Sequence, residues 1–200
     1  SRQDRIDALS AIADAHARHG HVQEVIVQNF LPKPGTTMHR SRPCPEDDYL
    51  DAIALARLIL PPEVHLQAPP NLSDDFGVLL DAGIDDWGGV SPVTSDHVNP
   101  ERPWPALERL AQVTEARGFA LAPRLTIYPR WALSPGRWLD EDLRFCVQDR
   151  SAAEGLGRDA PGAVFPEKMT ANHDAGAGAE VVVISTRANS STAWYSGAPV

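Results

Sequence analysis

Cysteine is scarce in this 200-residue chain, which contains only Cys44 and Cys146, far apart in the sequence. A zinc or iron–sulfur site ligated by cysteine needs three or four thiolates, usually at close spacing, so the chain cannot build one alone. Two cysteines also do not resemble the disulfide framework of a small secreted protein. A single disulfide between them is the alternative to two free thiols. We therefore expect no metal site within the chain and two incidental thiols, as in a cytoplasmic protein.

Long apolar runs and clusters of basic residues are also missing. No run approaches the roughly 20 apolar residues that span a bilayer, and residues 1–20 form a charged amphipathic segment, unlike a signal peptide. The net charge is −9, which argues against nucleic acid and against an anionic membrane as partners. The expected partner is a small-molecule substrate.

The common catalytic motifs are absent as well. The sequence has no nucleophile elbow, Walker loop, dinucleotide-binding glycine fingerprint or HExxH helix. Among the seven histidines only His97, with Asp96 and Glu101 nearby, is kept as a candidate, and an ordinary surface position explains it better. The catalytic residues therefore stay unknown.

The chain does have a regular alternation of helical and extended patterns. Helices of 10–15 residues that alternate with strands predict parallel strands joined by right-handed crossovers, and hence an α/β fold. The sequence predicts four helix–strand pairs, which are helix 3–19 with strand 22–29, helix 45–60 with strand 64–68, helix 73–82 with strand 85–90, and helix 105–117 with strand 119–127. One further helix is predicted after them, over 140–148.

Four strands are too few to close a barrel, and an open edge of buried-type strands is a liability. We therefore expect residues 1–150 to be the later part of a larger, TIM-like barrel that is truncated on its N-terminal side. Residues 151–200 are dominated by glycine, alanine, serine and proline, which predicts a linker or a loosely packed tail. Within that tail, residues 181–185 (VVVIS) have the composition of a strand.

Three of the expected strands end in uncharged polar side chains, and parallel strands bring their carboxyl ends to one rim. Such amides and hydroxyls suit a polar, hydrogen-bonding small molecule, although capping explains any single one of them. Asp85 and Asp86 are adjacent on a strand, so one faces this site and the other faces the helices. The candidate substrate- or cofactor-binding residues are Gln28, Asn29, Gln67, Asn71, Asp86, Trp87, Gly88, Gly89, Ser91, Asn99 and Arg102.

Four segments carry a family resemblance: QEVIVQNFLPKPGTTM, LQAPPNL, AGIDDWGGVSPVTSDHVNPERPWP and RLTIYP. They closely resemble the radical S-adenosylmethionine (SAM) enzymes that make the deazaflavin chromophore of coenzyme F(420), the 7,8-didemethyl-8-hydroxy-5-deazariboflavin (FO) synthase family. The resemblance covers about residues 3–150 and fits either a single subunit or the first half of a fused enzyme. It implies a partial TIM-like barrel of the radical SAM type, with SAM and a [4Fe–4S] cluster held by a CxxxCxxC motif.

The activity that the resemblance implies is that of an ammonia-releasing lyase. A 5′-deoxyadenosyl radical abstracts hydrogen from an adduct of tyrosine and 5-amino-6-ribitylamino-uracil, and the deazaflavin ring then closes. CxxxCxxC is absent from this chain, so we expect a substrate-side half that is inactive alone. Its implied partners are the missing N-terminal cluster-binding segment and the second FO synthase half or subunit. The alternative is a non-catalytic small-molecule-binding domain or a degenerate barrel fragment.

Overall fold

The computed structural model describes residues 1–90, 94–158 and 181–185, the last of these by their backbone. The chain divides into two compact units, Ser1–Gly88 and Gly89–Val200. Both units combine helices with parallel strands, so the predicted α/β class is confirmed. Every helix in the described part of the chain is too short or too polar to traverse a bilayer.

The first helix, α1 (Arg2–His19), begins and ends where local chemistry dictates. Ser1 is its N-cap and forms a capping box with Asp4, which satisfies backbone N–H groups that have no partner inside the helix. Gly20 ends the helix in the left-handed conformation with φ 64°, which costs glycine nothing. The helix therefore ends at the same residue as the predicted helix 3–19.

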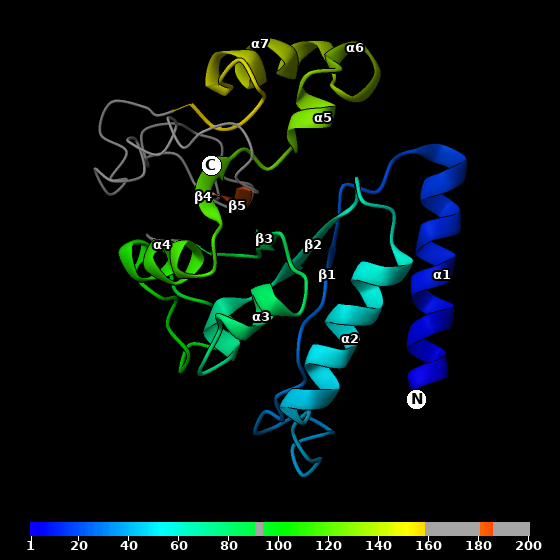
Figure 1. Cartoon of the computed structure of the whole chain (residues 1–200), viewed down its shortest axis with the longest axis vertical. Helices are drawn as coiled ribbons and strands as arrows, with labels where there is room; N and C mark the ends of the chain where they lie inside the picture. The colour runs from blue at the N-terminus through cyan, green and yellow to red at the C-terminus, as the bar shows by residue number, and fades with distance from the viewer. Residues whose placement is uncertain (91–93, 159–180, 186–200) are drawn as a thin grey trace. The chain divides into compact units, whose positions relative to one another are not determined.

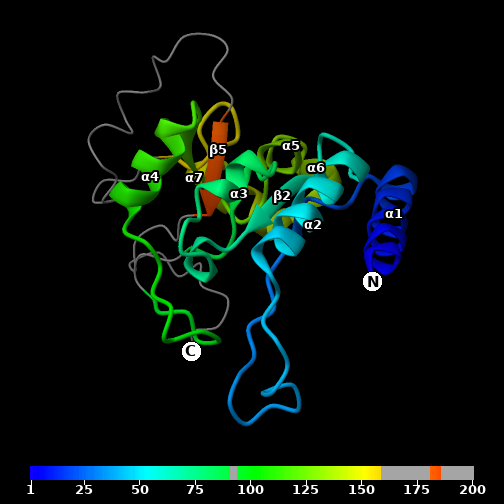
Figure 2. The same ribbon diagram turned by 60° about the horizontal axis from the view of Figure 1, so that its bottom comes forward.

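The second helix, α2 (Glu46–Ile59), lies beside α1 (Figure 1). Three acidic residues occupy its first turn, where they complement the positive end of the helix dipole. The helix buries Tyr49, Ile53 and Ala56 and ends before two prolines that cannot continue it. A long loop separates β1 from α2, and Figure 2 shows it reaching away from the helix. The backbone N–H of Cys44 donates to the carbonyl of Phe30 at 3.0 Å and so closes the base of this loop.

Three short strands of the first unit pair in parallel. They are β1 (Glu24–Ile26), β2 (His65–Ala68) and β3 (Asp86–Trp87), in the order β1-β2-β3. In their register Ile26 lies opposite Gln67, and Gln67 lies opposite Asp86. Side chains alternate between the two faces along a strand, and residues paired in register on neighbouring strands point to the same face. Gln67 and Asp86 therefore share one face of this sheet.

The two faces of the β1–β3 sheet differ in chemistry. One face, here called the helix-covered face, carries Leu66, Ala68 and Trp87, which are fully buried. Trp87 packs edge-to-face on Phe76, just before the short helix α3 (Val78–Asp81). The opposite face, here called the polar face, carries Glu24, Gln67 and Asp86. The sheet therefore separates a packed hydrophobic layer from a polar one.

The third helix is much shorter than predicted, because only Val78–Asp81 is helical. A carboxylate oxygen of Asp75 accepts a hydrogen bond from the Gly77 backbone N–H at 3.2 Å, which favours a local turn over a helical one. A 3-10 turn, η1 (Pro70–Leu72), follows β2 directly. It holds Asn71 at the carboxyl end of β2.

The second unit has its own parallel strand pair and four helices among its described residues. Strand β4 pairs in register with β5, so the strand composition of residues 181–185 does form a strand. Asp140 caps the last helix by accepting from the Asp142 N–H at 3.0 Å. The bounds are α4 (Leu107–Ala116), β4 (Ala120–Arg124), α5 (Pro129–Ala132), α6 (Pro135–Trp138), α7 (Glu141–Arg150) and β5 (Val181–Ser185).

A tight turn over 151–158 packs against β4 and α5. The Gly157 N–H donates to the Pro123 carbonyl at 2.9 Å, and Gly155 has φ +84°. A side chain at Gly155 would lie 2.9 Å from Pro129, so only glycine fits this close approach. The linker or loosely packed tail predicted over residues 151–200 stays a prediction, because residues 159–180 and 186–200 lie outside the described part of the chain.

Candidate functional site at the carboxyl ends of β1 and β2

Two of the predicted binding residues lie where the loops after β1 and β2 meet. The Asn29 Nδ2 donates to the carbonyl of Leu72 at 3.0 Å, which ties the β1 loop to the η1 turn that carries Asn71. Asn71 is buried, whereas Gln28 is exposed. The Asn29 Oδ1 atom is buried and accepts no hydrogen bond from the described residues. A buried amide oxygen of this kind is a natural acceptor for a ligand donor.

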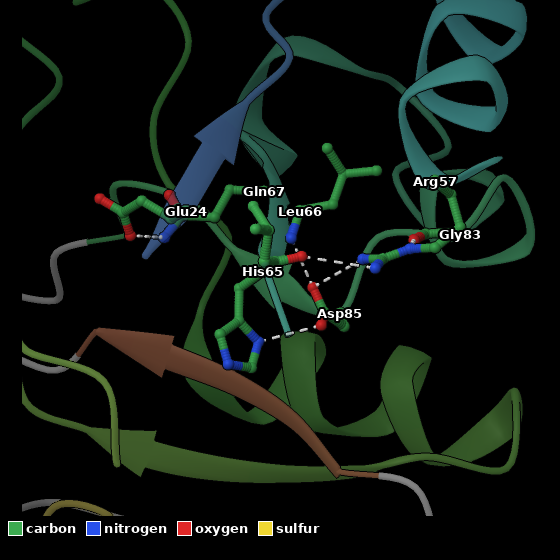
Figure 3. A network of polar contacts seen from close by, with 8 residues as sticks. Glu24, Arg57, His65, Leu66, Gln67, Gly83 and Asp85 are labelled. Atoms are coloured by element: carbon green, nitrogen blue, oxygen red, sulfur yellow. Dashed lines mark hydrogen bonds and ion pairs between the residues drawn. The ribbon is translucent and has the colours of Figure 1, made fainter. Parts of the chain in front are cut away.

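The polar face brings together Gln67 and Asp86, which are 2% and 0% exposed. Gln67 Nε2 donates to Glu24 Oε2, and Figure 3 shows this contact between neighbouring strands. Gly88 lies against the same amide, because a Cβ at Gly88 would come within 2.8 Å of Gln67 Oε1. Sequence reasoning missed Glu24, since nothing local connects it to a residue 43 positions away.

The contacts of Asp85 show that it is the one of the two adjacent aspartates that faces the helices. One carboxylate oxygen accepts from the Leu66 N–H at 2.7 Å, and the other contacts His65 Nδ1 at 3.0 Å (Figure 3). Arg57 reaches in from α2, with Nη2 3.0 Å from Asp85 Oδ1, and its Nε donates to the Gly83 carbonyl at 2.8 Å. Asp85 therefore joins α2 to the sheet, while Asp86 belongs to the polar face, as alternation predicts.

Trp87 lies on the helix-covered face, fully buried against Phe76. This packing gives it a place in the hydrophobic core and directs its ring away from the polar face. Its predicted role in binding stays a prediction.

Tyr49 is a further polar residue near the end of β1 that the sequence did not single out. Its hydroxyl donates to the carbonyl of Val27 at 2.8 Å. Burial, with a smaller contribution from Cys44, raises the pKa of the Tyr49 phenol well above its ordinary value. Tyr49 is therefore a neutral donor that fixes the backbone just ahead of Gln28 and Asn29.

Three remaining predicted residues, Gly89, Asn99 and Arg102, lie in described parts of the second unit. Ser91 lies outside the described residues. Gly89 has φ +75°, and a Cβ there would meet the Trp104 ring at 3.3 Å. Asn99 is buried and donates through Nδ2 to Asp96 Oδ2 at 2.8 Å, and its carbonyl accepts from the Arg102 N–H at 2.9 Å. These contacts order the loop internally; the binding roles of Gly89, Asn99 and Arg102 stay predictions.

The residues of this chain do not fit an iron–sulfur cluster. Cys44 and Cys146 are both free thiols in different units, and Cys44 Sγ contacts the Pro45 carbonyl at 3.5 Å. Among the described residues, no three His, Cys, Asp or Glu side chains gather as a metal site requires. Two thiolates are too few for the three or four that such a cluster needs.

Comparison with known proteins finds relatives of most of the chain among FO synthases and 7,8-didemethyl-8-hydroxy-5-deazariboflavin synthases. It is 48% identical over 159 residues to an FO synthase of Mycobacterium tuberculosis. It is 49% and 46% identical, over 158 and 157 residues, to 7,8-didemethyl-8-hydroxy-5-deazariboflavin synthases of Methanopyrus kandleri and Archaeoglobus fulgidus. The chain is a homologue of FO synthase. The predicted resemblance is confirmed, and a degenerate or merely ligand-binding domain is not favoured.

The FO synthase relatives are longer than this chain. The match takes in 78% of the chain but only 19% of the mycobacterial protein and 46% to 48% of the archaeal proteins. The chain therefore spans about half the length of the archaeal relatives that it matches. No protein-family model and no solved structure matches the chain.

Proposed function

We propose that this chain is the substrate-side part of a radical SAM FO synthase, an ammonia-releasing lyase of coenzyme F(420) biosynthesis. In this proposal the whole enzyme forms the deazaflavin ring from an adduct of tyrosine and 5-amino-6-ribitylamino-uracil. The identity of 46% to 49% with FO synthases and deazariboflavin synthases over 78% of the chain carries the proposal. The buried amides of Gln67 and Asn71, at the carboxyl end of β2, support it, since a ribityl chain and a uracil ring offer many hydrogen-bonding groups.

The finer fold that we propose is the later part of a TIM-like barrel. The parallel register of β1, β2 and β3 supports it, as does the contrast between a helix-covered face and a polar face. In a barrel of this type the helices lie outside and the ligand lies inside, at the carboxyl ends of the strands. In the described part of the chain β1 pairs on one side only, and its Ile26 is 52% exposed. A further strand beside β1 would cover both.

The cluster ligands, in this proposal, come from a cluster-binding segment outside these 200 residues. A [4Fe–4S] cluster with SAM would supply the radical chemistry of the whole enzyme, whereas this chain would bind and orient the substrate. Two cysteines cannot hold such a cluster, so the chain alone is expected to be inactive. The second FO synthase half or subunit is the further partner that the proposal implies.

Binding tests this proposal directly. We expect isothermal titration of the 200-residue chain with 5-amino-6-ribitylamino-uracil to give saturable binding, which weakens about tenfold in Asn71→Ala, since a buried amide would lose its ligand partner. Gln112→Ala, an exposed amide on α4, is the matched control and should bind as the unchanged chain does. Purified chain should yield no 5′-deoxyadenosine from SAM after iron and sulfide reconstitution. Absence of binding by the unchanged chain, or SAM cleavage by it alone, would contradict the proposal.

A further inference from the structure

The side-chain amide of Asn29 has a defined orientation just beyond the carboxyl end of β1. Its Nδ2 lies 3.0 Å from the carbonyl oxygen of Leu72 and donates to it. A backbone carbonyl accepts hydrogen bonds and cannot donate them, so the NH2 group must be the end of the amide that faces Leu72. The other end, the oxygen Oδ1, consequently turns away from Leu72.

This Asn29 oxygen has no hydrogen-bond donor. Oδ1 is buried, and none of the described residues donates a hydrogen bond to it. A buried acceptor without a donor costs free energy, so such atoms are rare in folded proteins and each one calls for a reason. The reason that fits a strand end is a donor supplied by a ligand, because ligands of parallel α/β sheets bind beyond the carboxyl ends of the strands.

Two hydrogen bonds fix the backbone on either side of Asn29. The Tyr49 hydroxyl donates to the carbonyl of Val27 at 2.8 Å, two residues before it. The Cys44 N–H donates to the carbonyl of Phe30 at 3.0 Å, one residue after it. Together with the bond to Leu72, these contacts hold the amide in place before any ligand binds. A group that is already ordered loses little conformational freedom on binding.

We propose that Asn29 is a specificity-determining residue, whose oxygen accepts a hydrogen bond from an N–H or O–H group of the ligand. The NH2 group is committed to Leu72, so the amide cannot reverse to donate. A ligand that presents an acceptor at this place would leave two acceptors facing each other and would be rejected. The inference rests on the proposed function, in which the ring N–H groups, the amino groups or the ribityl hydroxyls of 5-amino-6-ribitylamino-uracil supply the donor.

The first test follows the amide of Asn29 by carbon NMR in the unchanged, isotope-labelled chain. We expect saturation with 5-amino-6-ribitylamino-uracil to move the Asn29 Cγ resonance downfield, because a hydrogen bond to a carbonyl oxygen draws electron density from its carbon. The Cδ resonance of Gln112, an exposed amide in α4, is the matched control and should stay in place. A purely structural tie to Leu72 would leave Asn29 Cγ unmoved as well, and that result in a chain that binds the ligand would overturn the inference.

The second test compares two substitutions at Asn29 by isothermal titration of the full chain with the same ligand. Asn29→Ala removes both the acceptor and the bond to Leu72, and we expect the Kd to rise about tenfold or more. Asn29→Asp loses the donor to Leu72 but keeps an acceptor oxygen, so we expect a rise of only about two- to fivefold. Gln112→Ala should leave the Kd unchanged. Equal losses in Asn29→Ala and Asn29→Asp would assign the effect to the Leu72 tie and would overturn the specificity role.

Titration with 5,6-diaminouracil, which lacks the ribityl chain, distinguishes the two sources of the donor. Weaker binding of this probe by Asn29→Ala than by the unchanged chain assigns the donor to the pyrimidine ring and its amino groups, whereas equal binding assigns it to the ribityl hydroxyls. A Kd for 5-amino-6-ribitylamino-uracil within twofold of the unchanged chain in a folded Asn29→Ala would overturn this inference alone. Absence of binding by the unchanged chain would overturn the proposed function and this inference with it.

Discussion

The two faces of the β1–β3 sheet are built from the same short strands but differ in chemistry. On the helix-covered face Leu66, Ala68 and Trp87 are fully buried among apolar neighbours. On the polar face Glu24, Gln67 and Asp86 take the alternating positions. Burying a polar group costs free energy unless a partner satisfies it, whereas burying an apolar group stabilises the fold directly. We therefore expect changes on the helix-covered face to lower stability and changes on the polar face to alter binding.

Replacement of Trp87 by alanine should produce the largest effect and tests the contrast most strongly. The indole is fully buried and packs edge-to-face on Phe76, so Trp87→Ala should lower the free energy of unfolding by about 3–5 kcal/mol. The matched control is Ile26→Ala on the opposite face, where the side chain is half exposed and the loss should stay below about 1 kcal/mol. Urea unfolding of both variants measures the difference; equal losses would contradict the contrast.

The alternation of helices and strands was predictable because its signals are local. Gly20 ends α1 and the prolines after Leu60 end α2 at the expected places. The helices α5 and α6 escaped prediction because four residues that begin with proline carry no helical period. Similarly, the third helix shortened because Asp75 caps Gly77, a contact that competes with the helix and has no periodic signature.

The candidate site was predictable only in part, because its geometry depends on contacts distant in sequence. Alternation placed Asp85 and Asp86 on opposite faces, but only the register with β2 shows which of them lies beside Gln67. The Glu24 carboxylate and the Gly88 backbone meet the Gln67 amide across strands that the sequence does not align. The sequence thus predicts which residues lie at the strand ends, but it does not predict which residues of other strands contact them.

Asp85 should have an intermediate effect and sharpens the contrast between the adjacent aspartates. Asp85→Ala removes the acceptor of the Leu66 N–H and the partner of Arg57, so we expect a loss of about 1–3 kcal/mol in the free energy of unfolding. Asp85→Asn keeps an acceptor for the Leu66 N–H and should lose less. Asp14→Ala, an exposed position on α1, should change stability by less than about 0.5 kcal/mol.

Binding separates the roles of the two aspartates further. Because Asp85 lies with the helices, a folded Asp85→Asn should retain the Kd for 5-amino-6-ribitylamino-uracil measured with the unchanged chain. A loss of affinity as large as that of Asn71→Ala would place Asp85 in the ligand site and would contradict the assignment of the two faces.

Tyr49 should have the smallest effect at neutral pH, where Tyr49→Phe loses one hydrogen bond to Val27, about 0.5–1.5 kcal/mol. Its effect depends on pH, since burial raises the pKa of the Tyr49 phenol in the folded chain. The unfolded chain releases this proton near pH 10, where the folded chain still retains it. Stability that Tyr49 contributes is therefore complete below about pH 10 and is lost as the pH rises further. Unfolding of both proteins between about pH 8 and 11 should show the unchanged chain losing stability faster than Tyr49→Phe; parallel curves would mean that the phenol is not held neutral by burial.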